Sequence, residues 1–221
     1  MRASDRAYSI LREEILEGAL PAGTLLAEVE QSSRLGISRT PLREALSRLG
    51  ADGLVAAHSG RGLVVTEVST KDIAALFEVR QALEQQSARL AARHRDVAAF
   101  EALQREFRHA DELLENGDPT RRQYYELVAR LDAAIDEAAA NPFLLSNLEI
   151  VRTHVARIRR LSHDNPQRLR EAAREHLLIV DAIIDGSESL AAHATQLHLY
   201  RSLKNILGSL EPQPTIPRAS A

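Results

Sequence analysis

The chain has 221 residues and contains neither cysteine nor tryptophan. Without cysteine it can form no disulfide and no thiolate metal site, although this absence points to no particular compartment. Aromatic residues make up only 4% of the sequence, so the cores must be built mainly from Leu, Ala, Ile and Val. That composition favours helix-on-helix packing over a sandwich of sheets. A mainly α-helical protein is therefore expected.

Long apolar runs are also missing from the sequence. No segment approaches the ~18 uninterrupted apolar residues of a membrane span. Residues 1–14 carry scattered charges in place of the apolar region of a signal peptide. We therefore expect no membrane association and a cytoplasmic location.

The overall charge of −3 says little about a nucleic-acid partner, so the distribution of charge matters more. The first 68 residues hold eight arginines and nine acidic residues, a net charge of −1. Within residues 34–48, however, four arginines stand against one acidic residue. A local cluster of this kind is typical of a surface that meets DNA phosphates.

The first part of the chain has the element order of a winged helix-turn-helix domain. Apolar residues recur at helical spacing in three segments, and Gly36 supplies the tight turn between the second and third. Pro41 is tolerated in the first turn of a helix because the opening amides lack intrahelical partners there. The expected elements are a helix between Ser4 and Gly18, one over residues 28–35, one from Ser38 to Gly53, and two wing strands over residues 54–58 and 63–66.

The start of the third helix carries the side chains suited to reading DNA. Arg39 and Arg43 are four residues apart and project from one helix face, where each guanidinium can bond guanine O6 and N7. Ser38 and Thr40 are suited to phosphate or base-edge contacts, and Arg61 at the wing tip to a phosphate or the minor groove. These residues are candidate operator contacts.

Surface ion pairs with Glu44 or Asp52 are the alternative role for the two arginines. The complete order of helices, glycine turn and hairpin outweighs that alternative, because ion pairing would leave the order unexplained. It also resembles a known family: residues 18–23 (Gly-Ala-Leu-Pro-Ala-Gly), residues 35–46 and residues 60–62 (Gly-Arg-Gly) are similar to the GntR family of bacterial regulators.

The GntR resemblance covers about residues 8–68. It implies that Ser38, Arg39, Thr40 and Arg43 contact operator DNA and that Gly60 lies at the wing tip. One departure is Val29, which stands where some relatives have a DNA-contacting arginine. The set of contacts in this chain is accordingly expected to be smaller.

From Thr70 onward the sequence is helical throughout. A long first helix begins there, and short loops between the helices predict antiparallel neighbours in a bundle of about six. The five further helices are expected over residues 97–115, 121–140, 143–161, 167–184 and 187–207. The expected domains are residues 1–68 for DNA binding, 69–210 for effector binding and dimerisation, and 211–221 as a flexible tail.

Three segments of the second domain resemble the FCD subgroup of the GntR family. They are residues 77–84 (Phe-Glu-Val-Arg-Gln-Ala-Leu-Glu), Asn141-Pro142 and Glu175-His176. The resemblance spans about residues 70–207 and implies a homodimer whose helical domain binds small organic acids. Arg80 is the candidate effector ligand, since an arginine fork can clamp a carboxylate. An Arg80–Glu84 ion pair at i,i+4 is the alternative.

The FCD resemblance also implies a divalent metal held by an Asp-x-x-x-His pair and two later histidines. His176 and His198 correspond to the later ligands, but Val128 and Asp132 stand at the first pair. Asp132, His176 and His198 would still provide one carboxylate and two imidazoles, which suit zinc, nickel or manganese. The alternative is two core histidines that bond an aspartate and backbone carbonyls.

The sequence thus predicts a sequence-specific DNA-binding regulator, a repressor, that a small carboxylate effector controls. It is not expected to be an enzyme. Two alternatives remain: a helical metalloenzyme that uses Asp132, His176 and His198, and a DNA-binding dimer that needs no effector.

Overall fold

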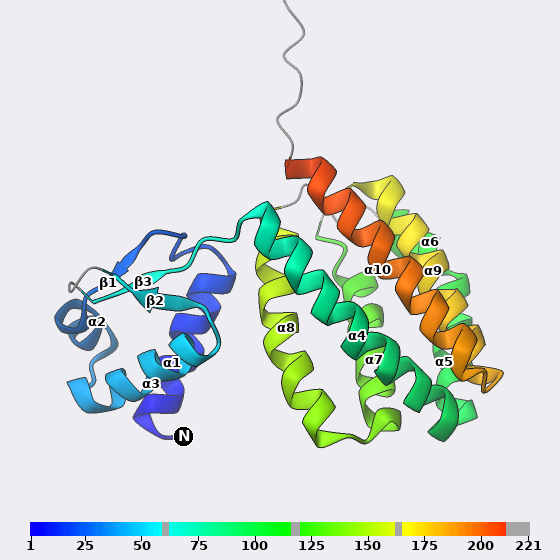
Figure 1. Ribbon diagram of the computed structural model, residues 1–221, viewed down its shortest axis with the longest axis horizontal. Helices are drawn as coiled ribbons and strands as arrows, with labels where there is room; N and C mark the ends of the chain where they lie inside the picture. Colours follow the sequence, from blue (N-terminus) through cyan, green and yellow to red (C-terminus); the bar gives the residue numbers. More distant parts are fainter. Residues whose placement is uncertain (59–61, 116–119, 162–164, 211–221) are drawn as a thin grey trace, which may run out of the picture. The chain divides into compact units, whose positions relative to one another are not determined.

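The computed structural model describes residues 1–58, 62–115, 120–161 and 165–210 (Figure 1). Their contacts divide into two compact units. The first contains Met1–Ser69 together with Arg152–Leu161, and the second contains Thr70–Val151 and the helices that follow residue 164. Gly60 and Arg61 at the expected wing tip, and the expected flexible tail at 211–221, lie outside the described residues.

The first unit is a winged helix-turn-helix, as the sequence predicted. Its elements are α1 (Ala3–Leu16), β1 (Leu25–Leu26), α2 (Glu28–Leu35), α3 (Arg39–Ala51), β2 (Val55–Ala57) and β3 (Leu63–Val65). The strands form an antiparallel sheet in the order β1-β3-β2, with Leu25 opposite Val64 and Val55 opposite Val65. Strand β1 was not predicted, because two residues are too few to show a period-two pattern.

The core of the first unit explains how α3 is oriented. The inner face of α3 buries Leu42, Leu46 and Leu49 against α1 and the sheet. Gly36 follows α2 with φ +64, the left-handed conformation that ends a helix and that glycine adopts without strain. The turn therefore sets α3 in place with its opposite face toward solvent.

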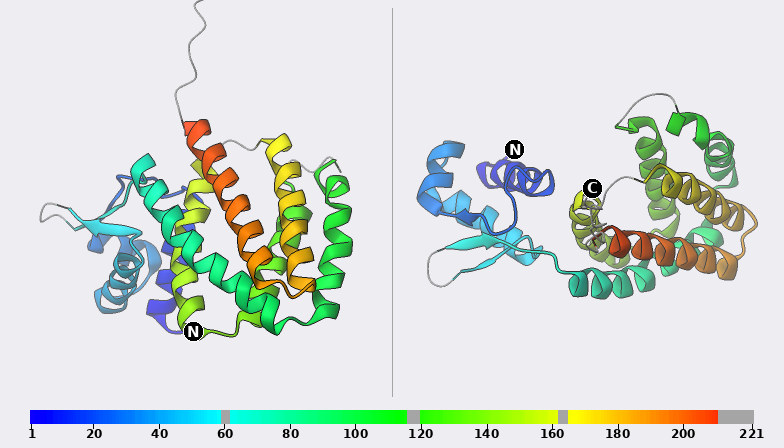
Figure 2. Two further views of the ribbon diagram at one scale, coloured as in Figure 1. Left: turned by 45° about the vertical axis from the view of Figure 1, so that its right-hand side comes forward. Right: turned by 90° about the horizontal axis from the view of Figure 1, so that it is seen from above.

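The second unit is an all-helical bundle (Figure 2). Its helices are α4 (Thr70–His94), α5 (Val97–Arg108), α6 (Ala110–Glu115), α7 (Arg122–Ala139), α8 (Pro142–Leu161), α9 (Pro166–Ile184) and α10 (Glu188–Leu210). The α8 residues from Arg152 onward belong to the first unit. Asn141 and Asn165 accept backbone N–H bonds at the starts of α8 and α9, so the two predicted Asn-Pro breaks are helix N-termini.

The prediction from the sequence was wrong about one helix. Residues 97–115 were expected to form a single helix, but the chain leaves helical geometry at His109, with φ −108 and ψ 14. No glycine or proline marks this break. The bend allows Phe107 and Ala110, on either side of it, both to be buried in the bundle core. Packing therefore determined a break that local sequence did not show.

Small residues bring the central helices of the bundle together. Ala88, Ala91 and Ala92 of α4 and Ala191 and Ala192 of α10 are almost fully buried, and these two helices lie side by side (Figures 1 and 2). Alanine side chains allow helix axes to approach closely. Helix α10 also packs against α9. Polar side chains of the three helices, Arg80, Glu175 and His198, are buried in the same bundle. In the described residues no helix has the length and apolarity to cross a membrane.

Candidate nucleic-acid interface and effector site

The solvent face of α3 carries the predicted operator contacts. Ser38 is the residue immediately before the helix, and Arg39, Thr40 and Arg43 lie in its first two turns. All four are exposed. They lie on the exposed side of the helix, away from the buried leucines, because the helix repeats every 3.6 residues. The fold therefore presents these side chains on the surface that a recognition helix uses.

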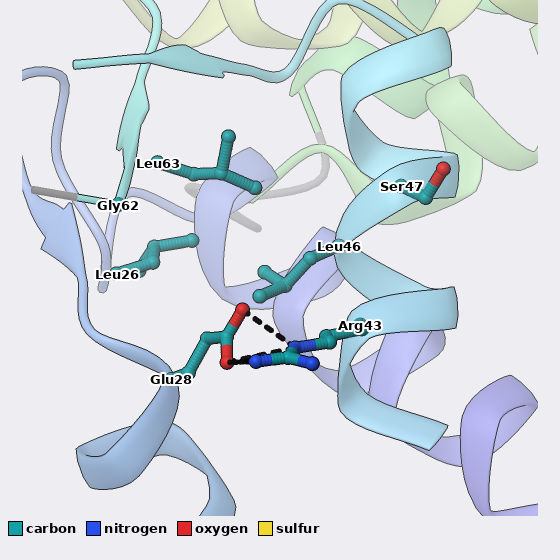
Figure 3. Close-up of a pocket in the computed structure, with 7 residues that line it drawn as sticks. All are labelled: Leu26, Glu28, Arg43, Leu46, Ser47, Gly62 and Leu63. Carbon is teal, nitrogen blue, oxygen red and sulfur yellow. Dashed lines mark hydrogen bonds and ion pairs between the residues drawn. The ribbon is translucent and has the colours of Figure 1, made fainter. Parts of the chain in front are cut away.

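Arg43 makes an ion pair, but with neither of the carboxylates considered from the sequence. Its Nε lies 3.0 and 2.9 Å from the two carboxylate oxygens of Glu28, and its Nη2 lies 2.9 Å from Oε2 (Figure 3). Asp52 instead accepts a 2.6 Å hydrogen bond from the Tyr8 hydroxyl. Hydrogen bonding from Arg43 lowers the pKa of Glu28, so the pair stays ionised at neutral pH. Spacing along α3 could not reveal Glu28, because it lies on α2.

A hollow lies beside this pair, between α3 and the sheet. It is lined by Leu26, Glu28, Arg43, Leu46, Ser47, Gly62 and Leu63 (Figure 3). Gly62 has φ +117, and a Cβ there would lie 3.4 Å from the carbonyl oxygen of Leu26. A side chain at this position would therefore strain the backbone where β3 leaves the wing. Glu28 and Arg43 form a polar part of this lining, so the hollow adjoins the side chains proposed to meet DNA.

The bundle contains a buried carboxylate that the sequence analysis did not single out for a role. Glu175 on α9 is 2% exposed and accepts hydrogen bonds from both terminal nitrogens of Arg168, at 3.0 and 2.8 Å. Arg201 donates a third bond at 3.1 Å and His198 a fourth at 2.9 Å. Arg168 and Glu175 are seven residues apart on one face of α9, a spacing that could have suggested the pair. The contribution of α10 could not be seen in the sequence.

The bond to Glu175 selects the tautomer of His198. An ionised carboxylate only accepts, so Nδ1 of His198 carries a proton, and because burial lowers the pKa of this ring its neutral form keeps the lone pair on Nε2. The His176 ring lies 4.4 Å from the His198 ring, centroid to centroid. The structure thus brings together two of the three predicted metal ligands, and it gives one of them the carboxylate partner that metal-binding histidines commonly have.

The third predicted ligand is Asp132 on α7. Among the described residues, no three His, Cys, Asp or Glu side chains form a group that could hold a metal ion. Two neighbouring imidazoles are suitable ligands for a divalent metal. Asp132 does not form a three-ligand group with them, however, so the predicted ligand set is incomplete in the described part of the chain. Val128, at the position where the FCD resemblance implies an aspartate, is instead part of the hydrophobic core. The metal expected from the sequence stays a prediction.

Arg80 is buried on the interior side of α4, with 6% of its surface exposed. Its Nε donates a 2.6 Å hydrogen bond to Glu84, and its guanidinium lies 5.0 Å from the centre of the Phe77 ring. The i,i+4 pair considered from the sequence is therefore present. Burial lowers the pKa of His198 and the positive charge of Arg80 lowers it further, against the hydrogen bond to Glu175. Arg80 and His198 thus lie in one polar region of the bundle.

An exposed arginine-bearing helix in a winged fold, joined to a bundle with a buried cluster of arginine, glutamate and histidine side chains, defines a DNA-binding transcriptional regulator with a helical effector domain. Residues 3–65 match the family described as bacterial regulatory proteins, gntR family, and residues 75–201 match the FCD domain. The chain belongs to the GntR family and carries an FCD domain. These proteins are regulators and not enzymes, so the metalloenzyme alternative is set aside.

Individual relatives agree with the family assignment. The chain is 35% identical to a probable D-xylose utilization operon transcriptional repressor of Paenarthrobacter nicotinovorans, over 84% of this chain and 80% of the relative. It is 27% identical to the HTH-type transcriptional repressor RspR of Escherichia coli, over 89% and 85% of the two chains. Its fold is similar to that of E. coli McbR/YncC, with a TM-score of 0.73 at 21% identity over 94% and 98% of the two chains.

Substitution of Glu175 tests the energetic importance of the buried cluster. Glu175→Gln leaves the buried Arg168 without its countercharge, and loss of one member of a buried ion pair costs roughly 3–5 kcal/mol. We expect a loss of this order in the free energy of unfolding at pH 7, measured with urea. Glu126→Gln removes a carboxylate from an exposed pair with Arg122 and should change stability little. Equal stability of the two variants would contradict this prediction.

The same cluster predicts how stability changes with pH. Burial alone would raise the pKa of Glu175, but hydrogen bonds from His198 and Arg168 outweigh it and lower this pKa. The pKa of His198 is also lowered. A depressed pKa contributes stability that is lost as the pH falls, so the His198 contribution should decline below about pH 6.5 and that of Glu175 below about pH 4.3. The stability gap between parent and Glu175→Gln should therefore narrow below about pH 4.

Proposed function

We propose that this protein is a homodimeric repressor, active in the cytoplasm, that binds a near-palindromic operator and responds to a small carboxylate effector. The observation that supports DNA binding is the exposed, arginine-bearing face of α3. The opposite face of this helix is buried in the core. The proposed operator contacts are Ser38, just before α3, the α3 residues Arg39, Thr40 and Arg43, and Gly60 and Arg61, which the sequence assigns to the wing tip.

Repression and dimerisation are supported by separate observations. Two relatives that align with more than four-fifths of this chain are named as transcriptional repressors. On α10, Leu190, Leu197 and Tyr200 are 57%, 40% and 58% exposed. Exposed apolar groups at this helical spacing suit a surface that a second copy covers. A two-fold dimer places its two recognition helices about one turn of DNA apart, which implies a near-palindromic operator.

Arginine substitutions test the operator contacts. Arg39→Ala and Arg43→Ala should each reduce specific binding by about 1–3 kcal/mol, because each removes a fork that can pair with a base. The measurement is titration of an operator selected from random duplexes, at fixed salt. Arg130→Ala removes the same charge from an exposed pair with Glu106 in the bundle and should have little effect. If both α3 variants bind like the parent, the contacts are misassigned.

Arg80 supports the effector part of the proposal. A guanidinium with 6% exposure is costly to bury, and here it is satisfied by Glu84 and lies near His198. A carboxylate that enters this region could take over the fork from Glu84 and make paired, charge-assisted bonds. Arg80 is therefore the residue by which we infer that the bundle distinguishes an acid from an uncharged compound.

Replacement of Arg80 should separate effector response from DNA binding. Arg80→Ala and Arg80→Lys should bind operator near normally but lose the change of about 5–150-fold that a carboxylate effector produces, since lysine keeps the charge without the fork. The assay is operator titration with a panel of small carboxylates, with D-xylose as an uncharged compound for comparison. Arg122→Ala, from an exposed i,i+4 pair, is the matched control. An unchanged effector response in both Arg80 variants would exclude this role.

The metal remains a separate prediction of the sequence. Asp132, His176 and His198 are the proposed ligands, and zinc, nickel or manganese would suit them with water or effector at the open positions. Elemental analysis of untagged protein should find about one equivalent of metal per chain. The His176→Ala variant should contain none, because it lacks one of the ligands. Absence of metal from the parent protein after growth with all three ions would favour the core-histidine role.

A further inference from the structure

We propose that Glu28 positions Arg43, so that the guanidinium is held ready to read a guanine before DNA arrives. The proposal rests on the operator-reading role of Arg43 given above and adds a residue that itself contacts no base. It is based on how the pair is formed, on where the carboxylate is anchored, and on which donors the pair leaves toward solvent (Figure 3).

The pair uses one particular edge of the guanidinium. Glu28 accepts bonds from Nε and Nη2, which form the side edge of the arginine fork. A guanidinium has five N–H donors, of which Nε supplies one and each terminal nitrogen two. Three donors then remain available, two on Nη1 and the second on Nη2. One donor of each terminal nitrogen lies on the end edge, and these two match the paired acceptors O6 and N7 of guanine.

The carboxylate is attached to a well-fixed part of the fold. Glu28 is the first residue of α2 and follows β1 after a single residue, so the backbone before it is hydrogen-bonded into the sheet. The N-terminal turn of a helix also favours a negative charge. Arg43 in turn is on α3, whose inner face is buried in the core. Both ends of the ion pair therefore leave rigid elements, and the pair restricts a long side chain that is 64% exposed.

Restriction in the free protein has a direct consequence for recognition. An arginine side chain loses rotamer entropy when it binds a base, and a side chain that is already held loses less at that step. The held orientation also makes a mismatched base more costly, because the fork cannot turn to find other acceptors. Glu28 should thus increase discrimination at the base that Arg43 reads, without increasing affinity for every sequence.

Removal of a carboxylate near DNA has a second effect that must be separated from positioning. A negative charge repels phosphates, so its loss strengthens binding to all sequences by a similar factor. Glu30 provides the matched control, because it is an exposed glutamate in the same first turn of α2. Glu28→Gln and Glu30→Gln remove the same charge from the same helix end, and only the first alters the pair with Arg43.

The experiment measures the affinity of the full chain for a selected operator and for duplexes with single base changes, at fixed salt. Arg43→Ala first identifies the base position at which discrimination is lost. We expect Glu28→Gln to reduce the preference at that position by about three- to fivefold, the most that an exposed ion pair can supply, and to leave other positions unchanged. Glu30→Gln should leave the preference at every position unchanged.

A double substitution completes the test. If Glu28 acts through Arg43, then Glu28→Gln should reduce base preference no further in the Arg43→Ala background. An equal gain of affinity on all duplexes in both glutamine variants, with base preference retained, would show that Glu28 acts only as a repelling charge and would overturn the proposal. If Arg43→Ala itself changes no base preference, the failure belongs to the proposed operator contacts. Melting temperatures of the variants check that each is folded.

Discussion

The burial of one face of α3 is the constraint on which the DNA-binding unit depends. Leu42, Leu46 and Leu49 fill the core shared with α1 and the sheet, and their removal from water fixes the rotation of the helix about its axis. Because the side chains repeat every 3.6 residues, that rotation also determines that Arg39 and Arg43 point outward. The same leucines therefore stabilise the fold and present the reading surface.

The two kinds of ion pair in this protein have different physical roles. The Glu28–Arg43 pair is solvent-exposed, and pairs of that kind contribute at most about 1 kcal/mol to stability. Its importance is the orientation that it imposes on one guanidinium. In the Glu175 cluster the carboxylate, Arg168 and His198 are buried and must satisfy one another for the bundle to stay folded, while Arg201 adds a bond from a half-exposed position. One pair therefore tunes recognition, whereas the other is a condition for the helices to pack.

Two buried arginines of the bundle each have a carboxylate partner, Glu84 for Arg80 and Glu175 for Arg168. Arg201 also contacts Glu175, from a half-exposed position, and Arg80 depresses the pKa of His198. A carboxylate effector of the kind proposed above would therefore bind here by replacing Glu84 as the partner of Arg80. Linkage then requires that such an effector and the operator change each other's affinity by the same factor.

The sequence by itself determined the winged helix-turn-helix, the helical bundle and most helix limits. The reason is that apolar periodicity, the turn at Gly36 and the two Asn-Pro breaks act over only a few residues. It also indicated Arg39 and Arg43, since spacing along one helix decides which side chains share a face. The Arg80–Glu84 pair was accessible for the same reason.

Only the tertiary structure decided which partners meet from different elements. It paired Arg43 with Glu28, gathered Arg168, His198 and Arg201 around Glu175, and added β1 to the sheet. It also showed that the helix expected over residues 97–115 ends at His109, where the burial of Phe107 and Ala110 outweighs the local preference for a continuous helix. Each of these outcomes depends on contacts between residues far apart in the chain or on which side chains are buried in the core. The spacing of residues along the sequence does not show either.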